Sequence, residues 1–147
     1  MDLKTRINEA VKDAMRARER ERLAALRLVT AEIKRVEVDE RIEVDDARVL
    51  AILDKMIKQR LDSERQYRDA NRPELAEVEA FEISLIREFM PEPLDEAAIA
   101  EMIEAAIAET GAEDMRAMGK VMGVLKPKIQ GRADMAAVSA QVKQRLG

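Results

Sequence analysis

The chain has 147 residues and a formal net charge of -4, and 47% of its residues are hydrophobic and 38% charged. This length fits one ordinary domain or two small ones, and the apolar content is sufficient for a core. Histidine and cysteine are absent. Zinc and non-haem iron sites usually draw on these residues, and a nucleophile needs a base to activate it. The composition therefore predicts no metal site, no cofactor and no enzyme activity.

The residue types and the hydropathy pattern predict an all-α, cytoplasmic protein. Only 2% of the residues are aromatic, whereas straight-chain residues, which lose little side-chain freedom in a helix, are abundant. No apolar run approaches the roughly 20 residues of a membrane span, and the N-terminus lacks the apolar core of a signal peptide. We therefore expect no membrane contact.

Apolar side chains recur at helical spacing throughout residues 1–91 and predict four helices. An aspartate precedes two of these helices, at the N-cap position where its side chain can accept a hydrogen bond from a backbone N–H. A proline is the first residue of another helix, where its missing N–H costs nothing. The predicted helix starts are Asp2, Asp45 and Pro73, and the side chains expected inward are Leu3, Ile7, Ala10, Val11, Ala14, Met15, Leu23, Leu26, Val29, Ile33, Val36, Val49, Leu50, Leu53, Met56, Ile57, Leu61, Leu75, Val78, Leu85, Ile86 and Phe89.

A domain boundary is predicted at residues 90–93, which contain two prolines. A proline there cannot continue a helix and restricts the residue before it. We expect an N-terminal domain of four helices over residues 1–91 and a C-terminal three-helix bundle over residues 95–147. The boundaries expected within the bundle are Asp95 and Gly111 for the first helix, Pro127 or Gly131 for the end of the second, and Asp134 for the start of the third.

Charge is distributed unevenly along the C-terminal part of the chain. Residues 92–114 contain eight acidic residues and no basic one, whereas residues 115–147 contain seven lysines and arginines and a single acidic residue, Asp134. A clustered positive surface can contact phosphates and release counterions, although a solvated basic face is the plainer interpretation. The basic residues singled out are Lys120, Lys126, Lys128 and Arg132, with Lys143 and Arg145 on the following helix.

Two glycines, Gly119 and Gly123, lie four residues apart in one expected helix. Each costs about 1 kcal/mol relative to alanine inside a helix, so a short helix with both is locally unfavourable unless another group approaches it closely. A neighbouring helix could pack against this bare strip, and a nucleic-acid backbone could do the same. The residues alone leave both alternatives open.

Several short segments carry a family resemblance. They are Met118-Gly119-Lys120-Val121-Met122-Gly123, Leu125-Lys126-Pro127-Lys128, Gly131-Arg132-Ala133-Asp134, Val138-Ser139, Ile57-Lys58-Gln59-Arg60, Leu75-Ala76-Glu77 and Glu109-Thr110-Gly111-Ala112. Together they cover nearly the whole chain in the order of the family's motifs, and they resemble the GatB/YqeY family and in particular its free-standing YqeY-like proteins. The departure is mild: Phe89-Met90-Pro91 stands where the family often has tyrosine, leucine and proline.

The resemblance implies a helical N-terminal domain followed by a three-helix bundle similar to the tail of the B subunit of tRNA-dependent amidotransferases. The resemblance also implies that this tail helps to hold tRNA by its outer surface, at a distance from the catalytic site. Free-standing members lack the parts that perform transamidation. The positions that match the motif are Gly119, Lys120, Gly123, Lys126, Lys128, Gly131 and Arg132, with Lys143 and Arg145 as a secondary basic surface.

We therefore expect a non-catalytic, amidotransferase-related accessory protein that holds the backbone of tRNA with its basic, glycine-containing hairpin. The alternative is a protein–protein adaptor that binds an aminoacyl-tRNA synthetase or an amidotransferase without contacting RNA. In the alternative, the acidic segment and the exposed helix faces would supply the binding surface.

Overall fold

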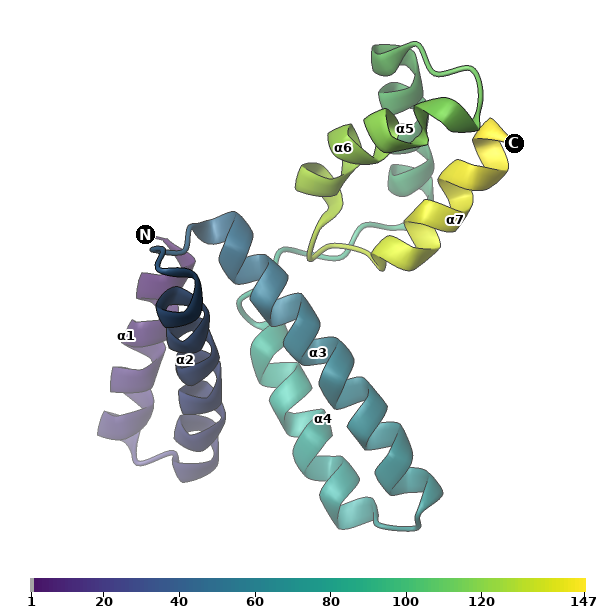
Figure 1. The fold of residues 1–147 in the computed structure, drawn as a ribbon. Coiled ribbons are helices and arrows are strands. Elements are labelled where there is room, and N and C mark those ends of the chain that lie inside the picture. The colour runs from purple at the N-terminus through teal and green to yellow at the C-terminus, as the bar shows by residue number, and fades with distance from the viewer. Residues whose placement is uncertain (1) are drawn as a thin grey trace. The chain divides into compact units, whose positions relative to one another are not determined.

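The computed structural model describes residues 2–147, and within these it contains α-helices and one short 3-10 helix but no strand, which confirms the all-α prediction (Figure 1). The chain divides into two compact units, Met1–Met90 and Pro91–Gly147. The elements are α1 (Leu3–Ala17), α2 (Arg20–Glu40), α3 (Asp46–Asp69), α4 (Pro73–Arg87), α5 (Glu96–Thr110), η1 (Met115–Ala117), α6 (Met118–Ile129) and α7 (Met135–Leu146).

The N-terminal unit is built from two helical hairpins, α1–α2 and α3–α4, as the purple-to-teal part of the ribbon shows (Figure 1). Its core is apolar, because the buried stripes of all four helices contribute aliphatic side chains to one cluster. Polar contacts join the hairpins: the backbone N–H of Leu3 donates to Asp46 Oδ1 at 2.9 Å, and Arg22 Nη1 pairs with Glu88 Oε2 at 2.8 Å. Its most deeply buried side chains include Ile7, Leu26, Val29, Val49, Leu53 and Ile86.

The C-terminal unit packs α6 against both α5 and α7. Its small core is formed by three helix stripes, and the segment before α5 closes onto the α6–α7 turn, where the backbone N–H of Leu94 donates to the carbonyl of Arg132 at 2.8 Å. The core side chains are Ile99, Ile103, Ala106, Val121, Leu125, Ile129, Val138, Val142 and Leu146.

The predicted helix caps are confirmed. Each capping aspartate accepts a backbone N–H bond two or three residues further on, which satisfies a donor that the first helical turn leaves unpaired. Gly111 and Gly131 follow helices with φ of +66° and +79°, a left-handed conformation that suits glycine. The capping bonds are Asp2 to Thr5 at 2.8 Å, Asp45 to Arg48 at 2.9 Å, Asp95 to Ala98 at 2.7 Å and Asp134 to Ala136 at 3.0 Å.

Four side chains expected in the core are instead exposed: Met15, Leu61, Leu75 and Val78. Leu85, which follows Val78 by seven residues and so lies on the same side of α4, is buried, and the α4 residues of the core cluster begin at Ile83. The prediction for Leu75 and Val78 was wrong because the core covers only the C-terminal half of this side of α4.

Pro127 does not end α6, which continues to Ile129. A proline at this position leaves the carbonyl four residues earlier without its helical donor. That carbonyl belongs to Gly123, which is exposed, so water can replace the missing donor at little cost. Of the two predicted stops, Gly131 is the one that the left-handed backbone supports.

Among residues 2–147, no helix is both long enough and apolar enough to cross a membrane.

Candidate nucleic-acid interface

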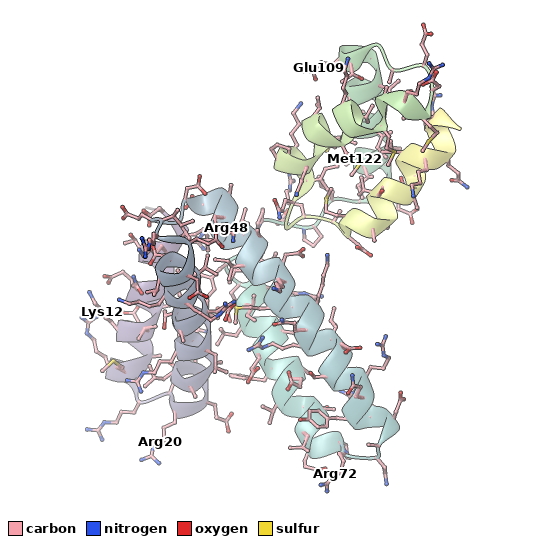
Figure 2. All side chains as sticks on the ribbon, viewed as in Figure 1. Lys12, Arg20, Arg48, Arg72, Glu109 and Met122 are labelled. Carbon is pink, nitrogen blue, oxygen red and sulfur yellow. The ribbon has the colours of Figure 1, made fainter. Side chains whose placement is uncertain are left out.

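Helix α6 has one buried face and one bare face. Val121, Leu125 and Ile129 recur every four residues and are completely buried in the C-terminal core. Met122 lies beside them and packs against the same cluster (Figure 2). The helix turns by about 100° per residue, so Gly119, Gly123 and Pro127 follow one another along its solvent-exposed side.

The exposed side of α6 is bare of side-chain atoms at the two glycines. A Cβ atom built on Gly119 or on Gly123 would meet no other heavy atom within 4 Å. The first alternative drawn from the sequence, that a neighbouring helix of the bundle packs against this strip, is therefore wrong for the C-terminal unit. Each glycine lowers the stability of the helix by about 1 kcal/mol relative to alanine, and packing within the C-terminal unit does not offset this loss.

The exposed backbone at Gly119 and Gly123 is called the glycine strip, and Lys120 and Lys126 lie on opposite sides of it. Both are exposed, and among the residues that the structure describes neither has a carboxylate within ion-pair distance. Lys128 projects further round the helix, where its Nζ lies 4.0 Å from Glu109 Oε2 near the end of α5. The structure thus brings Gly119, Lys120, Gly123 and Lys126 together on one face and places Lys128 at its acidic edge.

Gly131 and Arg132 lie in the α6–α7 turn rather than on the exposed helix face. Arg132 Nε donates to the carbonyl oxygen of Glu92 at 3.2 Å, and its own carbonyl accepts from Leu94. These bonds hold the segment before α5 against the turn. Gly131 provides the left-handed residue that the turn requires.

Lys143 and Arg145, the secondary basic surface, point in different directions from α7. Arg145 forms a bidentate pair with Glu104 on α5, through Nε to Oε1 and through Nη2 to Oε2 at 3.0 Å. The hydrogen bond between them lowers the pKa of Glu104 and raises the pKa of Arg145. Lys143 precedes Arg145 by two residues and so lies on the other side of the helix, without an ion-pair partner in residues 2–147.

Arg116 is a residue that the sequence interpretation did not single out. It lies in η1, directly before α6; its side chain is 93% exposed, and its Nη2 lies 3.4 Å from Asp114 Oδ2. It precedes Gly119, Lys120 and Gly123 by three, four and seven residues, which places it on the same side of the helix. This helical spacing was available in the sequence, but Arg116 lay outside the family motif.

The arrangement presents positive charge that can attract anions. Three flexible cations, Arg116, Lys120 and Lys126, surround a strip on which a ligand can approach the helix backbone. Within residues 2–147 no cluster of three or more histidine, cysteine, aspartate or glutamate side chains is placed to hold a metal ion, and no buried side-chain nitrogen or oxygen lacks a hydrogen-bond partner.

Comparison with known proteins identifies the family. The model of the YqeY-like protein family matches residues 4–146. The altered inheritance of mitochondria protein 41, mitochondrial, of Pyrenophora tritici-repentis is 28% identical over 145 residues, which cover 97% of this chain and 80% of that protein. An uncharacterized protein of Schizosaccharomyces pombe is 32% identical over 91 residues, which cover 62% of this chain and 74% of that protein. The resemblance inferred from the sequence is confirmed, and the chain belongs to the YqeY-like protein family.

Proposed function

We propose that this protein is a non-catalytic RNA-binding accessory protein, and that the exposed face of α6 holds the backbone of tRNA. The observation that carries the proposal is the combination of an uncovered glycine strip with three cations around it, Arg116, Lys120 and Lys126. The relationship to tRNA-dependent amidotransferases, expected from the sequence, supports tRNA as the RNA class.

The charge of this face favours a phosphate backbone as its ligand. Although the net charge of the chain is -4, residues 115–147 are strongly basic. Lysine and arginine side chains that neutralise phosphates release counterions, which gives binding that weakens steeply with salt. Lys120 and Lys126 carry this charge on exposed side chains, and Arg116 adds to it although it also pairs with Asp114.

The basic C-terminal segment contains no aromatic residue, which favours a folded RNA over a single strand as its ligand. Tyr67, Phe81 and Phe89 are the aromatic residues of the chain, and all precede Pro91. Proteins that bind single strands commonly stack bases on aromatic side chains, whereas RNA helices are recognised by shape and by contacts with phosphate and ribose. The glycine strip suits the second mode, because a sugar–phosphate backbone can lie close to the main chain of α6.

Titration of labelled tRNA with the intact protein at low and moderate salt tests this proposal. The variant Lys120→Glu/Lys126→Glu reverses two exposed charges beside the strip, and Lys12→Glu/Lys34→Glu makes the same change of net charge on exposed lysines of the N-terminal unit. We expect the first variant to bind about tenfold more weakly or worse at low salt, with a salt slope reduced by about 1 for each phosphate that the protein no longer neutralises. The control variant should bind like the wild type.

Equal binding by the wild type and the Lys120→Glu/Lys126→Glu variant, or no binding at low salt, would exclude the α6 face as the RNA site. The adaptor function would then take precedence, since α5 presents Glu101 and Glu109 on an exposed acidic surface that can contact a synthetase or an amidotransferase. The cytoplasmic location expected from the sequence stays a prediction, because the name of the Pyrenophora relative places that protein in mitochondria.

A further inference from the structure

Helix α4 carries a second exposed surface, the α4 apolar strip, which consists of Leu75, Val78 and Phe81. Their relative exposures are 37%, 54% and 41%. Each follows the previous one by three residues, so their side chains are neighbours along the helix. Val78 lies two residues after the fully buried Ala76 and therefore points to the other side of α4, which further along the helix carries the buried Leu85.

The α4 apolar strip is unusual because it is continuous. Single exposed apolar side chains are normal on a protein surface, whereas adjacent ones on one helix mark an interaction site. Phe81 adds an aromatic side chain, the type most often found at the centre of protein interfaces. Its polar surroundings also match an interface, because a charged rim encloses the apolar centre.

That rim is acidic. Glu74 and Glu77 flank the strip and are exposed, and α4 has no basic residue before Arg87. Arg68 Nη2 lies 3.3 Å from Glu77 Oε1 and Arg72 Nη1 lies 4.0 Å from Glu74 Oε1, so two arginines offset part of this charge. Residues 60–82 nevertheless contain seven acidic residues against four arginines. Burial, and after it the neighbouring carboxylate of Glu82, raises the pKa of Glu79.

We propose that the α4 apolar strip docks a basic amphipathic helix of a partner protein. Apolar side chains of the partner, spaced at three and four residues, would cover Val78 and Phe81, and its lysines or arginines would lie beside Glu74 and Glu77. This is the helix-on-helix mode of recognition, in which the apolar contact supplies affinity and the charges select the partner and its orientation.

The acidic rim argues against two other occupants. The carboxylates of Glu74 and Glu77 repel the phosphates of RNA, so this surface binds a different class of ligand from the α6 face. A second copy of the chain that used the same strip would place these carboxylates opposite their own copies, and like charges across a close interface are unfavourable. A basic amphipathic helix can cover the apolar strip with its apolar side chains and pair its cations with the carboxylates of the rim.

Binding of synthetic helical peptides to the intact protein tests the proposal. The probe is an amphipathic peptide with leucines on one face and lysines on both flanks, and its partner peptide has every lysine replaced by glutamate. Fluorescence anisotropy measures affinity, and amide chemical shifts in NMR spectra locate the site. We expect the basic peptide to bind with shifts concentrated on α4, and the acidic peptide to bind at least about tenfold more weakly.

Matched variants separate the strip from a general attraction to acidic surfaces. Val78→Ser/Phe81→Ser should weaken binding of the basic peptide by about tenfold or more, whereas Met15→Ser/Leu28→Ser, which removes two equally exposed apolar side chains elsewhere, should not. Glu74→Gln/Glu77→Gln should weaken binding, and Glu96→Gln/Glu101→Gln on α5 should have little effect. Circular dichroism establishes that each variant keeps its helicity.

The proposal is overturned if the basic peptide does not bind, if Val78→Ser/Phe81→Ser binds it as well as the wild type, or if the shifts map to α5. A dimer that Val78→Ser/Phe81→Ser dissociates would also overturn it, in favour of self-association. The Lys120→Glu/Lys126→Glu variant should bind the peptide normally, so failure of RNA binding and failure of this docking surface are distinguishable.

Discussion

The ammonium group of Lys4 donates a 2.8 Å hydrogen bond to Glu37 Oε2, the same oxygen that accepts the backbone N–H of Val44 at 3.2 Å. One carboxylate thus connects α1, α2 and the loop that leads into α3. The hydrogen bond with Lys4, and after it the bond from Val44, lowers the pKa of Glu37, and the hydrogen bond with Glu37 raises the pKa of Lys4.

This carboxylate should make the N-terminal unit sensitive to acid. A group whose folded-state pKa is depressed contributes stability above its unfolded pKa, here the ordinary value of 4.5, and loses it as pH falls through the folded value. We therefore expect the midpoint of denaturant unfolding to fall as pH drops below about 4.5, and to fall less in Glu37→Gln, which cannot titrate. Glu9→Gln, at a partly exposed glutamate whose ion-pair partner within residues 2–147 is Lys12, is the control and should keep the wild-type pH profile.

The glycine strip should show a conflict between stability and binding. Because a Cβ atom on Gly119 or Gly123 meets nothing within 4 Å, alanine fits at both sites. Each substitution should raise the free energy of unfolding by about 1 kcal/mol, since alanine is the better helix former. On the proposed function, the same Gly119→Ala/Gly123→Ala variant should bind tRNA more weakly, because its methyl groups hold the backbone of the RNA away from α6. Denaturant unfolding and tRNA titration measure the two effects.

Gly111→Ala is the matched control for these substitutions. Gly111 has φ of +66°, and a side chain in this left-handed conformation costs about 1–2 kcal/mol. We expect this variant to be less stable than the wild type while its tRNA affinity is unchanged. Unaltered tRNA binding by Gly119→Ala/Gly123→Ala, together with its higher stability, would show that the bare strip serves neither folding nor RNA binding.

The helix starts could be predicted because each depends on a local signal. Asp45, Asp95 and Asp134 precede apolar stripes, and the cap is a contact within one turn. The exposure of Leu75 and Val78 could not be predicted, because it depends on how far along α4 the core extends. Tertiary contacts decide this, and the sequence of α4 carries apolar residues in both halves of the helix.

The candidate site was predictable only where its residues are close together in sequence. The motif identified Lys120 and Lys126, and helical periodicity places them around the glycines. The partners of Arg145 and Arg132, which are Glu104 and the carbonyl of Glu92, lie about forty positions away in sequence and had no local signature. These contacts show that two basic residues of the predicted surface already have partners in the folded unit.

The pair between Arg145 and Glu104 should limit the contribution of Arg145 to RNA binding. Glu104→Gln removes the carboxylate charge and frees the guanidinium, so we expect tRNA affinity at low salt to rise by about two- to fivefold. Glu101→Gln makes the same change of charge on α5 at a glutamate without a basic partner in the described residues, and it serves as the control. Equal gains in both variants would show that the acidic surface acts through its total charge, and no gain in either would contradict the prediction.

Pro127 should destabilise α6 by less than a proline in a buried helix interior does. Its missing N–H leaves the carbonyl of Gly123 to water on the exposed side of the helix, and both residues are exposed. Pro127→Ala restores that hydrogen bond but also frees the unfolded chain, so we expect a net gain of about 1–2 kcal/mol in the free energy of unfolding rather than the full 3 kcal/mol. Denaturant unfolding measures the gain, and hydrogen exchange should show slower exchange at the amides of Lys126 and Lys128. An unchanged or lower stability would contradict this prediction. It would mean that the backbone of α6 keeps the conformation imposed by the proline, so that the N–H of residue 127 does not bond to the carbonyl of Gly123.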